Sequence, residues 1–162
     1  MIIRELQEHE LHQLTELYSH YLNPDKVPPL TKEKVYEIWT KINANPCIHY
    51  FVGAVDQTMV ASCILTITPS FIRGGDGYGI IEHVVTHTQY RQKGYGTAMM
   101  KYSLAFAWEY GCTEVMLLSG SQNVRAHRLY ERLGFDKHRK TGFIIFKPDG
   151  GENGPKDTHR AR

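Results

Sequence analysis

Residues 91–97 place two cationic side chains and two glycines directly before a segment of helical periodicity. Arg91 and Lys93 carry the charges, and Gly94 and Gly96 follow them. The first turn of a helix has backbone N–H groups without partners, and the helix dipole places partial positive charge there. Glycines have no Cβ atom, so an anion can approach that backbone closely. The segment is therefore predicted to bind an anion, and a pyrophosphate is the expected ligand.

Two common phosphate-binding motifs do not account for this turn. The P-loop requires GxxxxGK followed by Ser or Thr, and the sequence contains no such run. The dinucleotide fingerprint GxGxxG fails because the residues from Gly94 read GYGTAM and lack the third glycine. The pattern present is R-x-x-G-x-G, from Arg91 to Gly96. A pattern this short also fits glycines that cap an ordinary strand-to-helix turn.

Regular elements are predicted on both sides of this turn. An apolar, β-branched run at residues 80–86 predicts a buried strand, and the segment after the turn predicts a helix to about Tyr110. A second apolar run, at residues 114–118, predicts another strand. A strand, a helix and a strand form a crossover connection, which implies two parallel strands.

A second pattern, Asn123-x-x-Ala126-x-x-x-Tyr130-x-x-x-Gly134-Phe135, lies about thirty residues after the first. Asn123 can cap a short helix that Gly134 ends. Asn123 and Tyr130 are two helical turns apart, so they project from one helix face and could line one groove. Alternatively, Asn123 only caps its helix, or Tyr130 only packs in the core.

Together the two patterns resemble the GNAT superfamily of N-acetyltransferases, over roughly residues 48–147. The family's coenzyme A loop reads Gln/Arg-x-x-Gly-x-Gly/Ala, and its second pattern is N-x-x-A-x-x-x-Y-x-x-x-G-F. The resemblance implies acetyl-CoA as acetyl donor. It also implies an α/β (α+β) fold with a mixed, mostly antiparallel central sheet flanked by helices. Residues 80–86 and 114–118 would form the splayed parallel strand pair that holds the donor.

The resemblance also implies the cofactor contacts. Pantetheine would pair with the main chain of Val84 and Val85, and the pyrophosphate would rest on the amides of residues 92–97. The implied cofactor-binding residues are Val84, Val85, Thr86, Arg91, Gln92, Lys93, Gly94, Tyr95, Gly96, Thr97, Asn123 and Tyr130.

Acetyl transfer to an amine needs an unprotonated nitrogen, a polarised thioester carbonyl and a proton for the leaving thiolate. Tyr130 is the candidate acid, since a phenol of pKa about 10 can protonate a thiolate of similar basicity. The resemblance places carbonyl stabilisation at the backbone N–H of Val85.

Strand alternation puts Ile80, Glu82, Val84 and Thr86 on one face, and His83, Val85 and His87 on the other. A carboxylate inside so apolar a strand should be desolvated, which makes Glu82 the candidate base. His83 is the alternative base. Glu82 would then have only a structural role.

The acceptor is less well defined. The resemblance implies direct attack by a primary amine without an acyl-enzyme, and two aromatic-rich N-terminal helices favour a small-molecule amine. Tyr18, Tyr21, Tyr36 and Trp39 are candidate acceptor contacts or core aromatics. A protein N-terminus or lysine is the alternative acceptor, and a non-catalytic acyl-CoA binding or sensing module is the alternative function. Homodimers are common in the family, so a homodimer is left open.

Length and composition favour one domain at residues 1–147 and a disordered tail at 148–162, which is rich in Gly and Pro. A net charge of +2 argues against a nucleic-acid partner, and no apolar run reaches membrane-spanning length. The charged start is unlike a signal peptide, so a cytoplasmic protein is expected. The three cysteines lack metal-ligand spacing, and the nine histidines are scattered, so buried free thiols and no metal are expected.

The remaining elements follow from periodicity and turn residues. Ile2 and Ile3 can begin a strand, and helices are predicted at about residues 8–21 and after Thr31. A hairpin is predicted from two strands at residues 47–55 and 59–68, and a glycine-rich loop at residues 69–79. A final strand is predicted at residues 141–147 (TGFIIFK).

Overall fold

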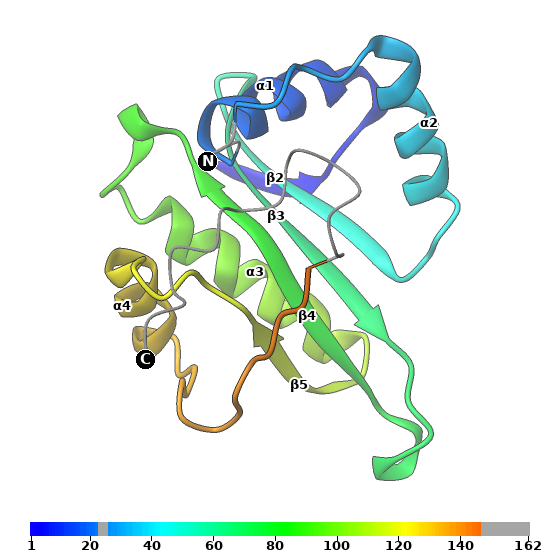
Figure 1. The fold of residues 1–162 in the computed structure, drawn as a ribbon, viewed down its shortest axis with the longest axis vertical. Helices are drawn as coiled ribbons and strands as arrows, with labels where there is room; N and C mark the ends of the chain where they lie inside the picture. The colour runs from blue at the N-terminus through cyan, green and yellow to red at the C-terminus, as the bar shows by residue number, and fades with distance from the viewer. Residues whose placement is uncertain (23–25, 147–162) are drawn as a thin grey trace.

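The computed structural model describes residues 1–22 and 26–146 (Figure 1). Its strands are β1 (Ile2–Glu5), β2 (Ile48–Val55), β3 (Thr58–Thr68), β4 (Gly77–Thr86) and β5 (Cys112–Leu117). Its α-helices are α1 (Leu11–Tyr21), α2 (Lys32–Asn43), α3 (Tyr95–Glu109) and α4 (Val124–Arg132). Three short 3-10 helices are η1 (Glu8–Glu10), η2 (Arg73–Gly75) and η3 (Thr88–Tyr90).

The strands form one sheet in the order β1-β2-β3-β4-β5. The first three pairings are antiparallel, and β4 pairs with β5 in parallel through the α3 crossover. Asp56 and Gln57 join β2 to β3 with φ of 48° and 65°, the left-handed pair that a tight hairpin requires. The predicted mixed, mostly antiparallel sheet with a parallel strand pair is confirmed.

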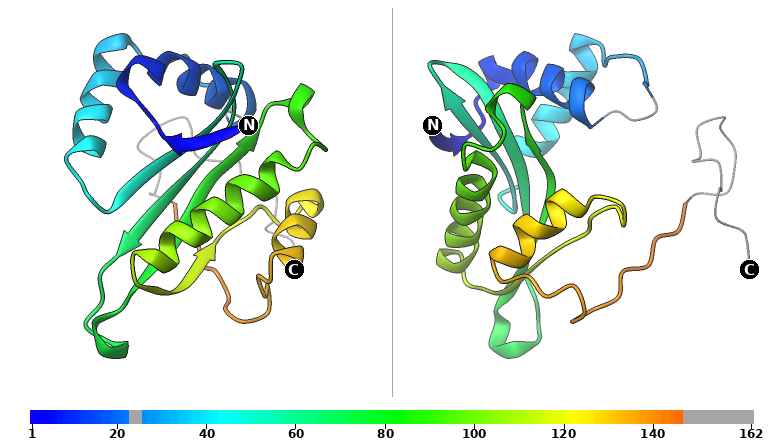
Figure 2. Two further views of the ribbon diagram at one scale, coloured as in Figure 1. Left: turned by 180° about the vertical axis from the view of Figure 1, so that it is seen from behind. Right: turned by 90° about the vertical axis from the view of Figure 1, so that its left-hand side faces the viewer.

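Helices cover both faces of the sheet, as the two views in Figure 2 show. On one face, Met99 and Met100 of α3 pack in a cluster with Phe51 and Leu65. On the other, the leucines of α1 pack in a cluster with Val52 and Val85, and side chains of α2 border that cluster. Because the sheet is sandwiched, the central strand β3 is buried almost continuously instead of alternating.

The final strand predicted at residues 141–147 is wrong for the part that the structure describes. Residues 141–146 form neither helix nor strand. The sequence pattern suits a strand, but a strand also needs a hydrogen-bonding neighbour, and in this structure residues 141–146 lie outside the sheet. Lys147 and the predicted tail at 148–162 lie outside the described residues.

Element boundaries differ from the predictions by a few residues. β4 begins at Gly77, so the glycine-rich loop is shorter than residues 69–79. Thr58, expected in the hairpin turn, is the first residue of β3. Thr31 caps α2 as predicted, because its side chain accepts a hydrogen bond from the Lys34 amide.

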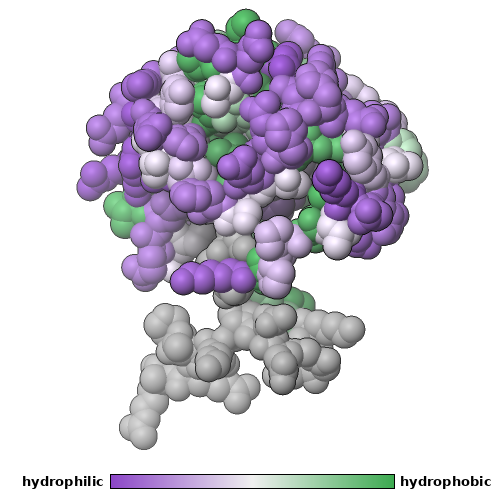
Figure 3. Space-filling model, turned by 90° about the horizontal axis from the view of Figure 1, so that it is seen from above, coloured by the Kyte–Doolittle hydropathy of each residue, from purple (hydrophilic) through white to green (hydrophobic). Residues whose placement is uncertain are grey.

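The surface seen from above is mostly hydrophilic, and apolar residues show only in places between polar ones (Figure 3). Within residues 1–22 and 26–146, none of the helices has both the length and the apolar character needed to cross a bilayer.

Candidate active site

The sheet opens between β4 and β5. Their pairing runs from Gly77 opposite Cys112 to Ile81 opposite Leu117, where β5 ends. β4 continues for five more residues, to Thr86, without β5 beside it. An unpaired strand edge presents backbone N–H and C=O groups, which suits an extended ligand with amide groups.

A β-bulge interrupts β4 at this opening. Its register against β3 shifts between Ser62 and Ile64, and His83 takes a left-handed φ of 49°. The bulge changes which side chains share a face. Ile81 and Val84, which alternation would put on opposite faces, both pack on the α3 side.

The exposure of Glu82 corrects the prediction for this residue. Strand alternation placed this residue among apolar side chains, but Glu82 and His83 are both exposed. The desolvation expected for Glu82 is therefore absent. Tyr50 lies opposite Ile64, which in turn lies opposite Glu82. Burial, and to a smaller extent the Glu82 charge, raise the pKa of the Tyr50 phenol.

The turn before α3 has the backbone shape predicted for an anion site. Gln92 and Gly94 take left-handed φ of 62° and 80°, and α3 begins at Tyr95. The first hydrogen bond along this helix runs from the Ala98 N–H to the Gly94 carbonyl at 3.0 Å. The three preceding amides, at residues 95–97, have no carbonyl one turn earlier within the helix.

Gly96 places this turn between β4 and α4. A Cβ built on Gly96 would lie 3.5 Å from Cδ2 of Leu129 in α4 and 3.6 Å from Oγ1 of Thr86. The amides of the turn therefore lie at the end of the opening between the splayed strands.

The two cations beside the turn rest on aromatic rings. The Arg91 guanidinium lies 5.3 Å from the centre of the Tyr21 ring, and its Nε donates to the Thr86 carbonyl at 2.9 Å. The Lys93 ammonium lies 5.1 Å from the centre of the Tyr90 ring. Both charges are thus held near the turn by cation–π contacts.

Tyr21, a candidate acceptor contact or core aromatic, lies beside this turn with its ring against Arg91. The Tyr21 hydroxyl also contacts the Thr88 hydroxyl, 67 positions along the chain, and nothing in the local sequence of α1 indicates this contact.

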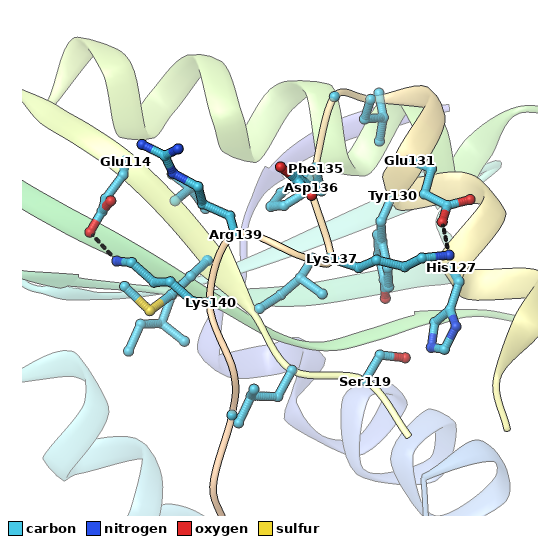
Figure 4. A pocket seen from close by; sticks show the side chains of 18 of the residues that line it. Glu114, Ser119, His127, Tyr130, Glu131, Phe135, Asp136, Lys137, Arg139 and Lys140 are labelled. Atoms are coloured by element: carbon cyan, nitrogen blue, oxygen red, sulfur yellow. Dashed lines mark hydrogen bonds and ion pairs between the residues drawn. The ribbon is translucent and has the colours of Figure 1, made fainter. Parts of the chain in front are cut away.

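The second sequence pattern forms α4. Asn123 caps the helix as predicted, because its Oδ1 accepts from the Ala126 N–H at 3.3 Å. Tyr130 is half-buried and lines a groove of about 880 Å³ between α4 and β5 (Figure 4). Burial, and to a smaller extent the nearby Cys63, raise the pKa of the Tyr130 phenol. The phenol therefore stays protonated at neutral pH and can act as a proton donor.

Polar and aromatic groups gather on the α1 side of the bulge. The Tyr18 hydroxyl lies 3.1 Å from Oγ of Ser62, and burial raises the Tyr18 pKa. The Tyr18 ring also meets the His83 ring edge-on, at 5.5 Å between centroids. Of the other predicted acceptor contacts, Tyr36 is exposed, and Trp39 packs against the cluster under α1.

Sequence reasoning missed Ser62 and Tyr50 on this face. Ser62 is a hydroxyl inside the apolar run of β3, and it is fully buried. A buried hydroxyl needs a hydrogen-bond partner, so the serine inside the apolar run of β3 could have indicated a polar contact at this position.

The cysteines are free, as predicted. Cys63 is fully buried 3.0 Å from the Ser103 hydroxyl, and burial raises its pKa to about 11. Cys47 is only half-buried, which corrects the expectation of burial at that position. The described residues contain no group of three or more His, Cys, Asp or Glu side chains that could hold a metal ion.

Comparison with known proteins places this geometry in context. The model of the acetyltransferase (GNAT) family matches residues 10–135. A glucosamine 6-phosphate N-acetyltransferase from Trypanosoma brucei brucei is 31% identical over 139 residues, which cover 85% of this chain and 90% of that protein.

Solved structures share the fold. A putative acetyltransferase from Agrobacterium tumefaciens is 31% identical with a TM-score of 0.84, over 91% of this chain and 100% of that one. An aminoglycoside acetyltransferase solved with a coenzyme A-linked bisubstrate analogue is 15% identical with a TM-score of 0.73, over 91% and 98% of the two chains.

Proposed function

Because the chain belongs to the GNAT family of acetyltransferases, we propose that it transfers the acetyl group of acetyl-CoA to the primary amine of a small molecule. The observation that carries this proposal is the opening between β4 and β5. The amides of residues 95–97 lie at its end, and Tyr130 lies in the groove beside β5.

The donor binds along this opening. The pyrophosphate accepts hydrogen bonds from the amides of residues 92–97, and Arg91 and Lys93 add positive charge near them. The pantetheine amides pair with the free edge of β4 near Val84. Asn123 positions α4, and with it Tyr130, by capping the helix.

The chemical step is a direct displacement. The amine nitrogen attacks the thioester carbon while a main-chain N–H on the free edge of β4 stabilises the negative charge on the carbonyl oxygen. The N–H of Val85, expected in this role, faces β3 instead, because Val85 lies opposite Ser62 in register with the bond from the His87 N–H to the Val60 carbonyl. The new C–N bond forms, the C–S bond breaks, and the leaving thiolate takes the Tyr130 proton. Burial favours the protonated phenol, which keeps that proton available.

Removal of the amine proton is assigned to Glu82, acting through water. Glu82 is exposed on the strand that holds the donor, so water can connect its carboxylate to the incoming amine. His83 is adjacent and is the alternative base. Tyr18 and Tyr50 border the same side of the sheet and are proposed as acceptor contacts.

An amino sugar is the acceptor class to test first. The trypanosomal relative, 31% identical over most of both chains, is a glucosamine 6-phosphate N-acetyltransferase. Aromatic and polar groups near Glu82, such as Tyr18 and His83, suit a polyhydroxylated amine. A protein N-terminus or lysine is the second candidate acceptor.

An amine panel tests the proposal. Calorimetry first establishes that the protein binds acetyl-CoA. Thiol release is then measured with glucosamine 6-phosphate, glucosamine, an aminoglycoside and a peptide with a free N-terminus, and products are identified by mass. Release with an amino sugar supports the proposal. Release with the peptide alone overturns the acceptor class, and binding without release with any amine favours a non-catalytic acyl-CoA module.

A further inference from the structure

One side chain of α1 contacts both strands at the bulge in β4. The Tyr18 hydroxyl lies 3.1 Å from Oγ of Ser62 in β3, and the Tyr18 ring meets the His83 ring of β4 edge-on, at 5.5 Å between centroids. The helix itself packs against β3 and β4 (Figure 1). Tyr18 therefore connects the two strands across the point where their pairing is irregular.

Ser62 is the regular partner next to the irregular pairing. It lies opposite Val85, and the regular pairing on the other side of the bulge has Ile64 opposite Glu82. One residue of β3 therefore faces two residues of β4, at positions 83 and 84. The Ser62 hydroxyl is thus placed directly beside the bulge.

The backbone at His83 depends on such neighbours. Its φ of 49° is left-handed, a conformation that is unfavourable for residues other than glycine and persists only where the surrounding structure determines it. Tyr18 contacts the ring of His83 itself, and through Ser62 it also contacts the strand opposite. Both contacts favour the bulged arrangement over a regular strand.

The hydroxyl of Ser62 gives this contact its direction. Ser62 is fully buried in an otherwise apolar run, and a buried hydroxyl without a hydrogen-bond partner is unfavourable. The Tyr18 hydroxyl provides the partner, and burial raises the pKa of this phenol, so it keeps its proton at neutral pH. The pair therefore fixes where α1 lies relative to β3 and β4.

We infer that Tyr18 and Ser62 are positioning residues for acetyl transfer: the hydrogen bond between their hydroxyls stabilises the bulge of β4, and thereby sets where the free edge of this strand presents its N–H and C=O groups to the donor. The role rests on the proposed function, which assigns the thioester to that edge. Ser62 is fully buried, so it contacts neither donor nor acceptor and acts only through the strand. A small displacement of the edge would misalign the thioester with the amine and lower the rate.

Three variants test this role, namely Ser62→Ala, Tyr18→Phe and the double variant. Each single variant leaves one buried hydroxyl without its partner, so its midpoint of urea unfolding should fall; the double variant leaves neither, so its midpoint should return close to the wild-type value. The hydrogen bond is absent from all three. Turnover, kcat, should therefore fall about tenfold in each of them and stay low in the double variant.

A merely structural role predicts a different result for the double variant. Its kcat would recover together with its stability, and that recovery would overturn the inference. Wild-type kcat in all three variants would overturn it as well. The matched control is Tyr110→Phe, which removes the hydroxyl that donates to the Pro46 carbonyl at 3.3 Å, away from the bulge, and should keep the wild-type kcat.

Ser62→Ala separates positioning from acceptor contact. Because Ser62 cannot touch the acceptor, KM for the amine should change less than about twofold while kcat falls about tenfold. The loss of kcat should be equal on both limbs of the pH profile, since a serine hydroxyl does not titrate there. A loss confined to one limb, or carried by KM alone, would contradict positioning.

Hydrogen exchange tests the bulge without any activity. The His87 N–H donates to the Val60 carbonyl at 2.8 Å just past the bulge. In the double variant, the amides of residues 83–87 should exchange about tenfold faster than in the wild type, while the pairing of β1 with β2 keeps its protection. Unchanged exchange at residues 83–87 overturns the inference. If the wild type releases no coenzyme A with any amine, the proposed function fails, and the exchange rates still decide whether the hydroxyl pair stabilises the bulge.

Discussion

The hydroxyl of Tyr21 accepts a hydrogen bond from the Thr88 N–H at 3.1 Å and lies 3.0 Å from Oγ1 of the same residue. The Tyr21 ring also lies under the Arg91 guanidinium. One side chain of α1 thus fixes the start of the segment that leads into α3. Because α1 and α3 cover opposite faces of the sheet, Tyr21 connects the turn before α3 to the α1 side.

Replacing Tyr21 should weaken donor binding. Tyr21→Leu removes the hydrogen bonds and the cation–π contact, together about 1.5 kcal/mol, which corresponds to a rise in KM for acetyl-CoA of roughly tenfold. Tyr21→Phe keeps the ring and should raise KM about threefold. In both variants kcat should change less than KM, as steady-state kinetics would show. The control is Tyr102→Phe, which also loses one hydroxyl but lies on α3, away from the turn; an equal effect there would contradict a specific role for Tyr21.

Tyr130→Phe should lower kcat about 100-fold, the usual size of a general-acid contribution. Affinity for acetyl-CoA, measured by calorimetry, should change little because the ring and its packing remain. Burial raises the pKa of the Tyr130 phenol above its ordinary value of about 10, so loss of this proton should reduce kcat only above that pH. Unchanged turnover in the variant would remove Tyr130 from the acid role.

Glu82→Gln and His83→Gln should separate the two candidate bases. If Glu82 takes the amine proton through water, Glu82→Gln should lower kcat/KM about tenfold and remove the acidic limb of its pH profile. His83→Gln should keep that limb. The expected loss is at the low end for a general base because Glu82 is exposed, so bulk water can partly replace it. An acidic limb that disappears only in His83→Gln would identify His83 as the base.

Much of this fold could be predicted from local sequence patterns. The turn at Gly94 and the cap at Asn123 are encoded by the residues themselves, since a positive φ favours glycine and a free amide favours a side-chain oxygen. The parallel β4–β5 pair also followed from the order of apolar runs, because a strand, a helix and a strand leave few topologies.

The bulge at His83 could not be predicted in this way. Nothing in the sequence of Glu82, His83 and Val84 indicates that His83 takes a left-handed φ, and the alternation rule therefore placed Val84 on the wrong face of the sheet. Such a conformation is imposed by the surrounding sheet and is common at functional sites.

The strand prediction for residues 141–146 was wrong for a different reason. Its residues have high strand propensity, but a strand depends on a neighbour that the local sequence does not specify. The contact between Tyr21 and Thr88 was missed for the same reason, since it joins two segments distant in the chain.

The ion pair between Glu10 and Arg4 should make the stability of the protein depend on acid pH. Glu10 is 4% exposed, both of its oxygens accept from Arg4, at 2.6 and 2.7 Å, and the Gln7 N–H adds a third bond at 3.1 Å. The hydrogen bonds from Arg4 hold the pKa of the Glu10 carboxyl below its ordinary value. A carboxyl with a lowered pKa in the folded state stabilises the protein above the unfolded pKa, and that contribution is lost as pH falls through the folded one.

Glu10→Gln should therefore lower the free energy of unfolding at pH 7 by about 2 kcal/mol, because it leaves Arg4 without its charged partner. The difference between wild type and variant should shrink as the pH falls below about 4, where the Glu10 carboxyl of the unfolded chain takes up a proton that the folded chain binds only at lower pH. Urea unfolding followed by circular dichroism from pH 7 to pH 3 measures both curves. The control is Glu37→Gln, since Glu37 also pairs with two cations, Lys34 and Lys41, but on the exposed surface of α2, where ion pairs contribute little. A constant difference in the free energy of unfolding between wild type and Glu10→Gln over this pH range would mean that side-chain packing, and not the charge of Glu10, stabilises the fold at this position.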